Sequence, residues 1–157
     1  MLHITLLCVG RIKTAWIAEG CAEYEKRLRG HAKFSVVELP ASKERDTDKQ
    51  KRNECERLMD VIEKLDADVW LLDEKGERMA SHEFAFFLTQ ARDAGRHLVF
   101  VLGGAYGLDP AMRRAPSVRG TMRLSDMTFP HELCRVVFLE QLYRGCEIGK
   151  GSGYHHH

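Results

Sequence analysis

A glycine-rich loop is the first place where residue types and spacing indicate chemistry. Residues 103–107 (G-G-A-Y-G) follow an apolar run and precede Asp109-Pro110, which is typical of a helix start. Glycines there let backbone amides approach a ligand closely, or hold backbone angles that other residues resist. The loop is not a dinucleotide-binding motif, because Leu102 stands in place of the first glycine, and it lacks the Lys-Ser/Thr pair of a P-loop. A ligand-binding loop of another kind and a plain tight turn both remain.

A second segment, residues 124–131 (L-S-D-M-T-F-P-H), combines small hydroxyls, apolar side chains and a proline that pre-sets a helix start. Such a mixture suits a cofactor that has a polar and an apolar part. It suits a capped helix entry equally well, and His131 would then be an ordinary residue of the first turn.

The third candidate region is the end of the chain. Arg144 follows Glu140 by four residues, which is the spacing of an ion pair on a helix surface. The functional alternative is an arginine that binds a phosphate or an RNA base. Tyr154 and His155 add an aromatic ring that stacks on bases and a group that exchanges protons near neutral pH. His155 to His157 also fit the remnant of a purification tag.

Apolar strands that alternate with helices are predicted to position these residues. The predicted strands are 3–9, 33–39, 68–72, 97–102 and 121–124, and the predicted helices are 16–28, 48–65, 81–94, a short one near 109, and 130–148. A turn is expected at 73–76, and Ser81 is expected to cap its helix. This alternation predicts an α/β fold with a mainly parallel sheet. Ligands bind beyond the carboxyl ends of such strands, which selects the loops after Leu72, Leu102 and Leu124.

Length and composition fit one domain over residues 1–157, with a flexible tail at 149–157. The chain is 44% hydrophobic and 30% charged, which is ordinary for a globular protein. Five scattered cysteines form no C-x-x-C pair, so we expect neither a metal site nor a redox centre. No secretory leader and no apolar run of about 20 residues is present, so we expect a cytoplasmic protein with no membrane segment.

Charge is unevenly distributed along the chain. Residues 1–33 and 111–157 each carry a net charge of +3, whereas residues 34–110 carry −5. Two basic ends that converge in the fold would form one positive surface for phosphates. Evenly solvated charge is the alternative.

Together these segments resemble the RlmH family, which comprises small SPOUT-superfamily methyltransferases with a C-terminal trefoil knot. The resemblance rests on residues 102–108 (L-G-G-A-Y-G-L), 124–135 (L-S-D-M-T-F-P-H-E-L-C-R), 139–144 (L-E-Q-L-Y-R) and the terminal Y-H at 154–155. Each motif is modest, but their order and spacing are specific. The resemblance implies methyl transfer from S-adenosylmethionine to ring nitrogen N3 of a pseudouridine in large-subunit (23S) ribosomal RNA, on assembled ribosomes. It also implies a homodimer in which the tail reaches a site completed by the neighbouring subunit.

Carried over residue by residue, the resemblance assigns two groups of site residues. The S-adenosylmethionine pocket maps to Leu72, Gly103, Gly104, Leu124, Ser125, Asp126, Met127, Thr128 and Phe129. The substrate side maps to His131, Arg135, Arg144, Tyr154 and His155.

The implied reaction needs a group that removes a proton from a weakly acidic imide nitrogen. His155 is the candidate proton acceptor, and Arg135 or Arg144 would stabilise the developing anion and hold phosphate. One departure is Gly145, which stands where a better helix former is usual and is expected to loosen the last helical turn.

Three alternatives remain open at this point. The first is a SPOUT enzyme that modifies another ribosomal or transfer RNA position. The second is a non-catalytic RNA-binding or ribosome-associated factor that keeps the fold, although it would no longer need the glycines at 103–107. The third is a nucleotide-dependent α/β enzyme, for which no motif is present.

Overall fold

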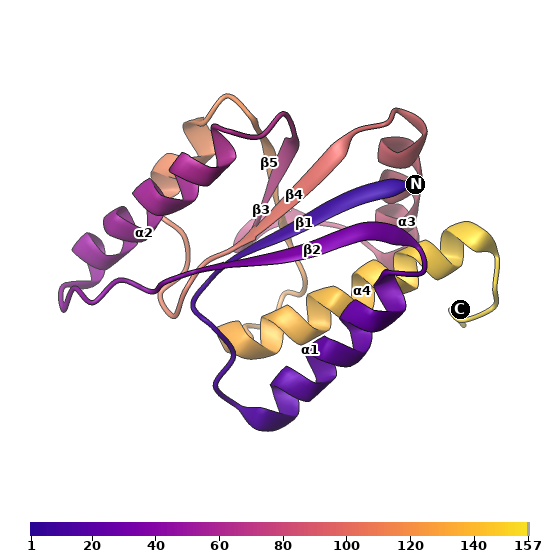
Figure 1. Cartoon of the computed structure of the whole chain (residues 1–157), viewed down its shortest axis with the longest axis horizontal. Coiled ribbons are helices and arrows are strands. Elements are labelled where there is room, and N and C mark those ends of the chain that lie inside the picture. The colour runs from indigo at the N-terminus through magenta and orange to yellow at the C-terminus, as the bar shows by residue number, and fades with distance from the viewer. Residues whose placement is uncertain (157) are drawn as a thin grey trace.

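Five strands form one parallel sheet in the order β2-β1-β4-β3-β5 (Figure 1). The computed structural model describes residues 1–156. The elements in chain order are β1 (Leu2–Val9), α1 (Ala15–Leu28), β2 (Ala32–Leu39), α2 (Thr47–Ile62), β3 (Asp68–Arg78), α3 (Ser81–Asp93), β4 (His97–Leu102), a 3-10 helix (Pro110–Arg114), β5 (Val118–Arg123) and α4 (His131–Lys150). The predicted α/β fold with a parallel sheet is confirmed.

Helices cover both faces of the sheet, and the alternation of side chains along β1 explains why. Leu2, Ile4 and Leu6 point to the face that carries α1, α3 and α4. Leu7 and Val9 point to the other face and pack with α2 and the 3-10 helix. The central strands are therefore apolar on both sides, as buried parallel strands are.

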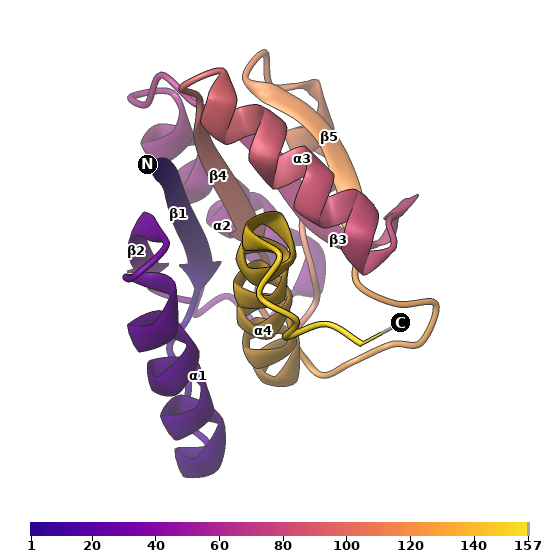
Figure 2. The same cartoon turned by 90° about the vertical axis from the view of Figure 1, so that its right-hand side faces the viewer.

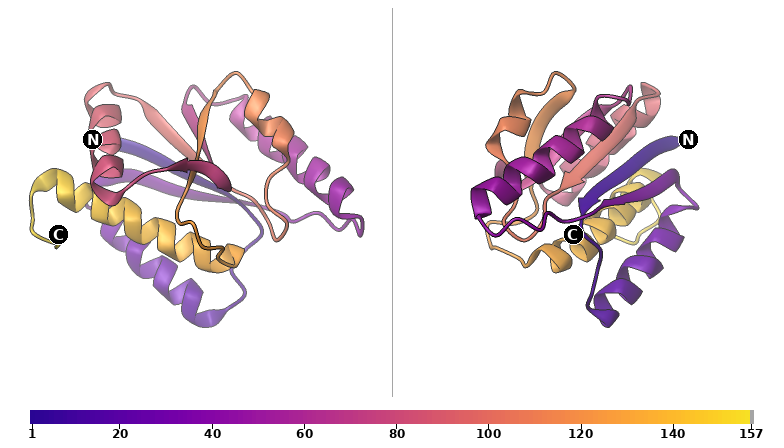
Figure 3. Two further views of the ribbon diagram at one scale, coloured as in Figure 1. Left: turned by 180° about the vertical axis from the view of Figure 1, so that it is seen from behind. Right: turned by 60° about the vertical axis from the view of Figure 1, so that its left-hand side comes forward.

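Helix α4 lies between α1 and α3 on the first face (Figure 2). Seen from behind, the segment that joins β5 to α4 runs from the sheet down to the start of that helix (Figure 3). Gly145 allows close packing here, because a Cβ at this position would lie 2.7 Å from Cδ1 of Leu88. Helix α4 continues through Gly145 to Lys150, so the expected loosening of its last turn is absent.

The turn predicted at 73–76 was wrong, because β3 continues to Arg78. Its register on β5 shifts between Leu72 and Glu77. Past this shift, the backbone of Gly76 lies against Met122, where a Cβ would come within 2.6 Å of the Met122 carbonyl carbon. The glycine therefore serves close approach of two strands, one of the roles that glycine has within strands.

Two helix ends also differ from prediction. Ala80 rather than Ser81 occupies the N-cap position of α3, and the carboxylate of Glu83 accepts the Ala80 N–H at 2.9 Å. The Ser81 hydroxyl instead donates to Gln141 of α4 at 2.7 Å. Helix α4 ends at Lys150 and is capped by Gly151, whose φ of +69° favours glycine, so the helix includes Gly149 and Lys150, which were assigned to the tail. Among residues 1–156, no helix has the length and hydropathy to span a bilayer.

Candidate active site

A cavity of about 780 Å³ opens at the carboxyl ends of β4 and β5 and beside the register shift that follows Leu72 within β3. This volume is in the range of pockets that hold small molecules and cofactors. The three loops selected from the sequence supply most of its lining, which comprises residues 72–75, 102–108, 124, 125 and 127–131, together with Lys51, Pro110, Arg113 and Cys134.

Gly103 and Gly104 form a wall of the cavity that has no room for side chains. A Cβ on Gly103 would lie 2.7 Å from the carbonyl carbon of Gly107, and one on Gly104 would lie 3.0 Å from Oε1 of Glu54. Glu54 is buried behind the loop, and its other carboxylate oxygen accepts the Ser42 N–H at 2.8 Å. Glu54 of α2 thus lies close behind Gly104, and residues 103–107 line the cavity.

The segment 124–131 forms the opposite side and is held by its own polar side chains. The Ser125 hydroxyl accepts the Met127 N–H at 3.0 Å, and the Thr128 hydroxyl donates to Glu74 at 3.0 Å. Met127 is 77% exposed at the rim. Of the nine residues assigned to the cofactor from the sequence, eight line the cavity: Leu72, Gly103, Gly104, Leu124, Ser125, Met127, Thr128 and Phe129.

Asp126 is the ninth, and it lies outside this lining. Its carboxylate pairs with Arg78 of β3 at 2.8 Å and with Nε of Arg123 at 3.5 Å. The Asp126 side chain therefore ties the loop to the two strand ends and is directed away from the cavity.

The side chains that line the cavity include cationic, anionic and apolar ones. Lys51 and Arg113 are positive, Asp73 and Glu74 are negative, and leucines, Met127 and Phe129 supply apolar surface. The cavity therefore offers cations for a ligand carboxylate, carboxylates for a cationic centre and apolar surface for an aromatic ring. Lys51 and Arg113 were not predicted as site residues, because on the sequence both are indistinguishable from solvated surface charge.

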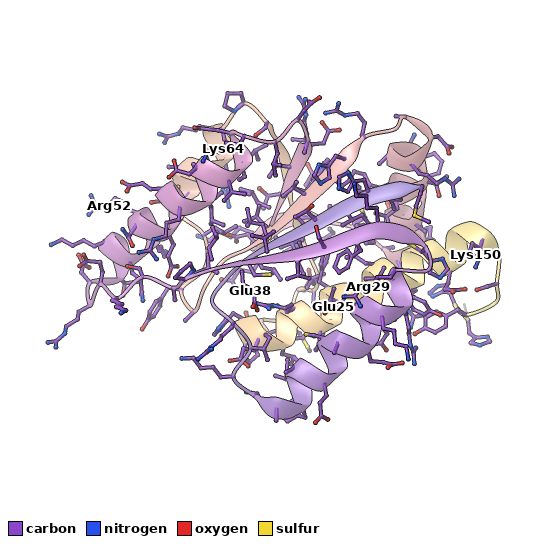
Figure 4. All side chains as sticks on the ribbon, viewed as in Figure 1. Glu25, Arg29, Glu38, Arg52, Lys64 and Lys150 are labelled. Atoms are coloured by element: carbon purple, nitrogen blue, oxygen red, sulfur yellow. The ribbon has the colours of Figure 1, made fainter. Side chains whose placement is uncertain are left out.

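Arg135 was expected on the substrate side, and the structure places its buried side chain in an ion pair with Glu38, which is partly exposed. Its guanidinium donates to Glu38 and, at 2.9 Å, to the carbonyl oxygen of Gly10. Figure 4 shows Glu38 toward the carboxyl end of β2, and Glu25 of α1 also contributes to the charge around Arg135. The side chain of Arg135 is only 8% exposed, so its hydrogen-bonding capacity is directed at the fold.

We expect replacement of Arg135 by methionine to lower the free energy of unfolding by about 2–3 kcal/mol, because Glu38 and the Gly10 carbonyl lose a charged, buried donor. Urea unfolding followed by circular dichroism measures this change. Arg27→Met is the matched control, since Arg27 pairs with Glu23 on an exposed helix face and such pairs contribute little. Equal stabilities of the two variants would contradict a structural role for Arg135.

Arg144, Tyr154 and His155 lie together at the far end of α4. The guanidinium of Arg144 lies 4.9 Å from the ring centroid of Tyr154, and one of its nitrogens is 3.0 Å from Nδ1 of His155. Tyr154 also packs edge-on against Tyr143 at 4.9 Å between ring centroids. Glu140 accepts from Arg144 at 2.7 Å, so the ion pair suggested by their spacing is present as well.

The two predicted halves of the site are separate within one chain. His131 lines the cavity, whereas Arg144 lies thirteen residues further along the same helix. At about 1.5 Å per residue, their Cα atoms are about 20 Å apart. One chain on its own therefore does not place Arg144, Tyr154 and His155 beside the cavity. His157 lies outside the described residues.

The cysteines are not suited to be nucleophiles. Burial raises the pKa of the Cys8 thiol to about 12 and that of Cys146 to about 11, so both are protonated near neutral pH. All five cysteines are unpaired. Within residues 1–156, no cluster of three or more His, Cys, Asp or Glu is arranged to hold a metal ion.

Comparisons with known proteins agree with this geometry. A family model described as "Predicted SPOUT methyltransferase" matches residues 2–155. Proteins named Ribosomal RNA large subunit methyltransferase H from Geobacter sp. (strain M21) and Geotalea daltonii are 41% and 40% identical, and each match covers 99% of this chain and at least 99% of the relative. The crystal structure of a hypothetical protein superposes with a TM-score of 0.51 over 94% of this chain and 81% of that one, at 16% identity, which shows a shared fold.

Proposed function

Because this chain belongs to the SPOUT methyltransferase family and is a methyltransferase, we propose that it methylates large-subunit ribosomal RNA with S-adenosylmethionine as the methyl donor. The target that we propose is ring nitrogen N3 of a pseudouridine. The observation that carries the proposal is the glycine-walled cavity, lined by the segments 102–108 and 124–131, which lie in two of the family motifs, and by residues 72–75 of β3.

The cavity suits S-adenosylmethionine by its chemistry. We assign the amino-acid carboxylate of the donor to Lys51 or Arg113, its ammonium or sulfonium to Asp73 or Glu74, and its adenine to the apolar lining. Backbone amides of Gly103 and Gly104 would supply hydrogen bonds without a side chain in the way, whereas the Gly107 N–H already donates to the Gly104 carbonyl. Leu72, Gly103, Gly104, Leu124, Ser125, Met127, Thr128 and Phe129 form the proposed contacts, and Asp126 positions their loop.

The proposed chemistry is one nucleophilic substitution. Bound S-adenosylmethionine supplies a methyl group that its sulfonium already activates. The enzyme's residues orient the base so that N3 forms a bond to the methyl carbon as the carbon–sulfur bond breaks, and the N3 proton leaves to His155 or to water. Arg144 stabilises the anion that develops on the base, Tyr154 stacks on it, and His131 contacts it at the mouth of the cavity. We assign Arg135 to positioning, because its guanidinium is bound by Glu38 and Gly10.

The distance between the two halves supports a homodimer. A second copy that packs with its α4 antiparallel to the first would bring its own Arg144, Tyr154 and His155 to the cavity of its partner. We also propose the C-terminal trefoil knot of the family. Its support is that the segments 102–108 and 124–131 line one cavity while α4 follows directly.

We propose the assembled ribosome or its large subunit as the substrate, in the cytoplasm. Residues 1–156 form one domain around a single sheet, and recognition of a large shape suits such a compact unit. We therefore expect free RNA oligomers that contain the target base to be methylated at least about 100-fold more slowly than ribosomes, because they lack the surface that orients the base. Initial rates with the two substrates measure this, and equal rates would contradict it.

Calorimetric titration tests the cofactor assignment. We expect saturable binding of S-adenosylmethionine and no binding of ATP or NAD to the same protein. Binding of a nucleotide alone would favour a nucleotide-dependent enzyme. Binding of none of them, with or without ribosomes, would favour a non-catalytic ribosome-associated factor.

A further inference from the structure

The amino-terminal end of the sheet carries a polar cluster on the face that α2 covers only in part. Figure 1 shows α2 toward the end of the sheet at which β1 finishes, and the first residues of β1 and β2 away from it. Along this face, Leu7 and Val9 are buried under α2, whereas His3 and His97 are half-buried and Lys33 is exposed. The cluster lies at the opposite end of the strands from the cavity.

Strand register places the three side chains in one row across the sheet. His3 of β1 is aligned with Lys33 of β2 on one side and with His97 of β4 on the other. The two imidazole rings stack with centroids 3.6 Å apart and planes that differ by 3°. The imidazole rings of His3 and His97 and the ammonium group of Lys33 therefore lie in adjacent positions on this face of the sheet.

A chain of hydrogen bonds holds the stack from within the sheet. The Thr5 hydroxyl lies 2.8 Å from Nε2 of His97, and Ser35 of β2 lies 3.3 Å from Thr5. Thr5 is buried, so this chain fixes the orientation of the His97 ring. Nδ1 of His97 and both ring nitrogens of His3 have no hydrogen-bond partner among residues 1–156.

The charges that act on the two rings are all positive. Burial and then Lys33 lower the pKa of His3, while burial, His3, Lys33 and Arg96 lower the pKa of His97. The carboxylates on the neighbouring side, Asp66 and Asp68, pair with Arg96. Within the described residues Lys33 has no ion pair, so its charge is not neutralised by the fold.

We propose that His3, Lys33 and His97 form a phosphate-binding site. An anion at this row would accept from the Lys33 ammonium and from ring N–H groups, and its charge would favour protonation of the two imidazoles beside Lys33. If the protein methylates ribosomal RNA as proposed above, the phosphate is one of the RNA backbone. It is bound about 20 Å from the cavity end of the sheet, since His3 lies six residues before the end of β1 at about 3.3 Å each. Binding strengthens as pH falls, because protonated imidazoles bind the anion.

Nuclear magnetic resonance of the ring nitrogens tests the site directly. We would titrate the ¹⁵N-labelled protein from pH 8 to pH 5 in chloride and in inorganic phosphate of equal ionic strength. We expect phosphate to raise the pKa values of His3 and His97 by about 0.5–1 pH unit, as a nearby opposite charge does. His82, an exposed residue of α3, is the internal control and should not change. Shifts of His3 and His97 no larger than that of His82 would overturn the proposal.

The substitution Lys33→Ala distinguishes a specific phosphate site from general attraction between the protein and phosphate. This exposed substitution should leave the fold intact and reduce the phosphate-induced change at His3 and His97 to the level seen at His82. Lys26→Ala, on the outer surface of α1, removes the same charge elsewhere and should preserve the full response. An undiminished response in Lys33→Ala would also overturn the site.

A second arm identifies the source of the phosphate. A short single-stranded RNA should produce the same pKa changes, and Lys33→Ala should raise the KM for ribosomes by about three- to tenfold with kcat and S-adenosylmethionine affinity unchanged. A response to inorganic phosphate without one to RNA would refute the RNA backbone as the ligand. Absence of all methyl transfer in the wild-type protein would refute the proposed function and would leave the ring titrations interpretable.

Discussion

Replacement of Arg144 by alanine is expected to lower methyl transfer to ribosomes by about 10²–10³-fold, which is the usual effect of removing a group that stabilises charge in a transition state. S-adenosylmethionine affinity should stay within about twofold, because Arg144 is assigned to the base and its developing charge and not to the cofactor. Single-turnover transfer of a labelled methyl group and calorimetry measure the two quantities. Arg27→Ala is the matched control, since Arg27 lies over the ring of Tyr143 in the same aromatic cluster and has no assigned contact with the substrate.

The same variant tests the composite site. Arg144→Ala protomers mixed with Gly103→Ala protomers, whose cofactor site is impaired, should regain part of the activity. In a mixed dimer, one site combines the intact cavity of the first protomer with the intact Arg144 of the second. Near-normal turnover of Arg144→Ala alone would refute the role of this residue. Activity of a strictly monomeric protein would refute the shared site.

Gly103→Ala is expected to weaken S-adenosylmethionine binding by about 100-fold or more, since displacement of a positioning loop by about 1 Å has effects of that size. The reason is steric. The added Cβ would lie 2.7–2.8 Å from the carbonyl carbon and oxygen of Gly107, and backbone on both sides has to shift to admit it. Calorimetric titration measures the affinity, and thermal unfolding shows whether the variant stays folded.

Gly30→Ala is the control for this substitution. Its Cβ would meet only the Arg27 carbonyl at 3.6 Å, an ordinary contact distance, so affinity should be unchanged. A folded Gly103→Ala protein with wild-type affinity would mean that the 103–107 loop is a plain tight turn, which the sequence left open.

The position of the site was predictable from the sequence because it depends on topology. Alternating apolar runs fix the parallel sheet, and the carboxyl ends of its strands then select the loops after Leu72, Leu102 and Leu124. The structure confirms that these three segments line one cavity, although the residues after Leu72 continue β3 and form no loop. Their role in binding the cofactor stays a prediction.

Side-chain directions were not predictable, because they depend on partners that are distant in sequence. Arg135 pairs with Glu38, which is 97 residues away, and Asp126 pairs with Arg78 on a strand that was expected to have ended. Gly76 was interpreted as a turn residue because local sequence does not show which backbone lies against it. The His3–His97 stack likewise arises only once β1 and β4 are in register.

Transfer of an isotopically labelled methyl group from S-adenosylmethionine to ribosomes that lack the modification tests the central claim most directly. The large-subunit RNA would then be digested and its nucleosides analysed by mass spectrometry. The account predicts one labelled product, a pseudouridine methylated at N3, that depends on the wild-type protein and is absent with Gly103→Ala. Label on a different nucleoside, or no label from a protein that binds S-adenosylmethionine, would contradict it.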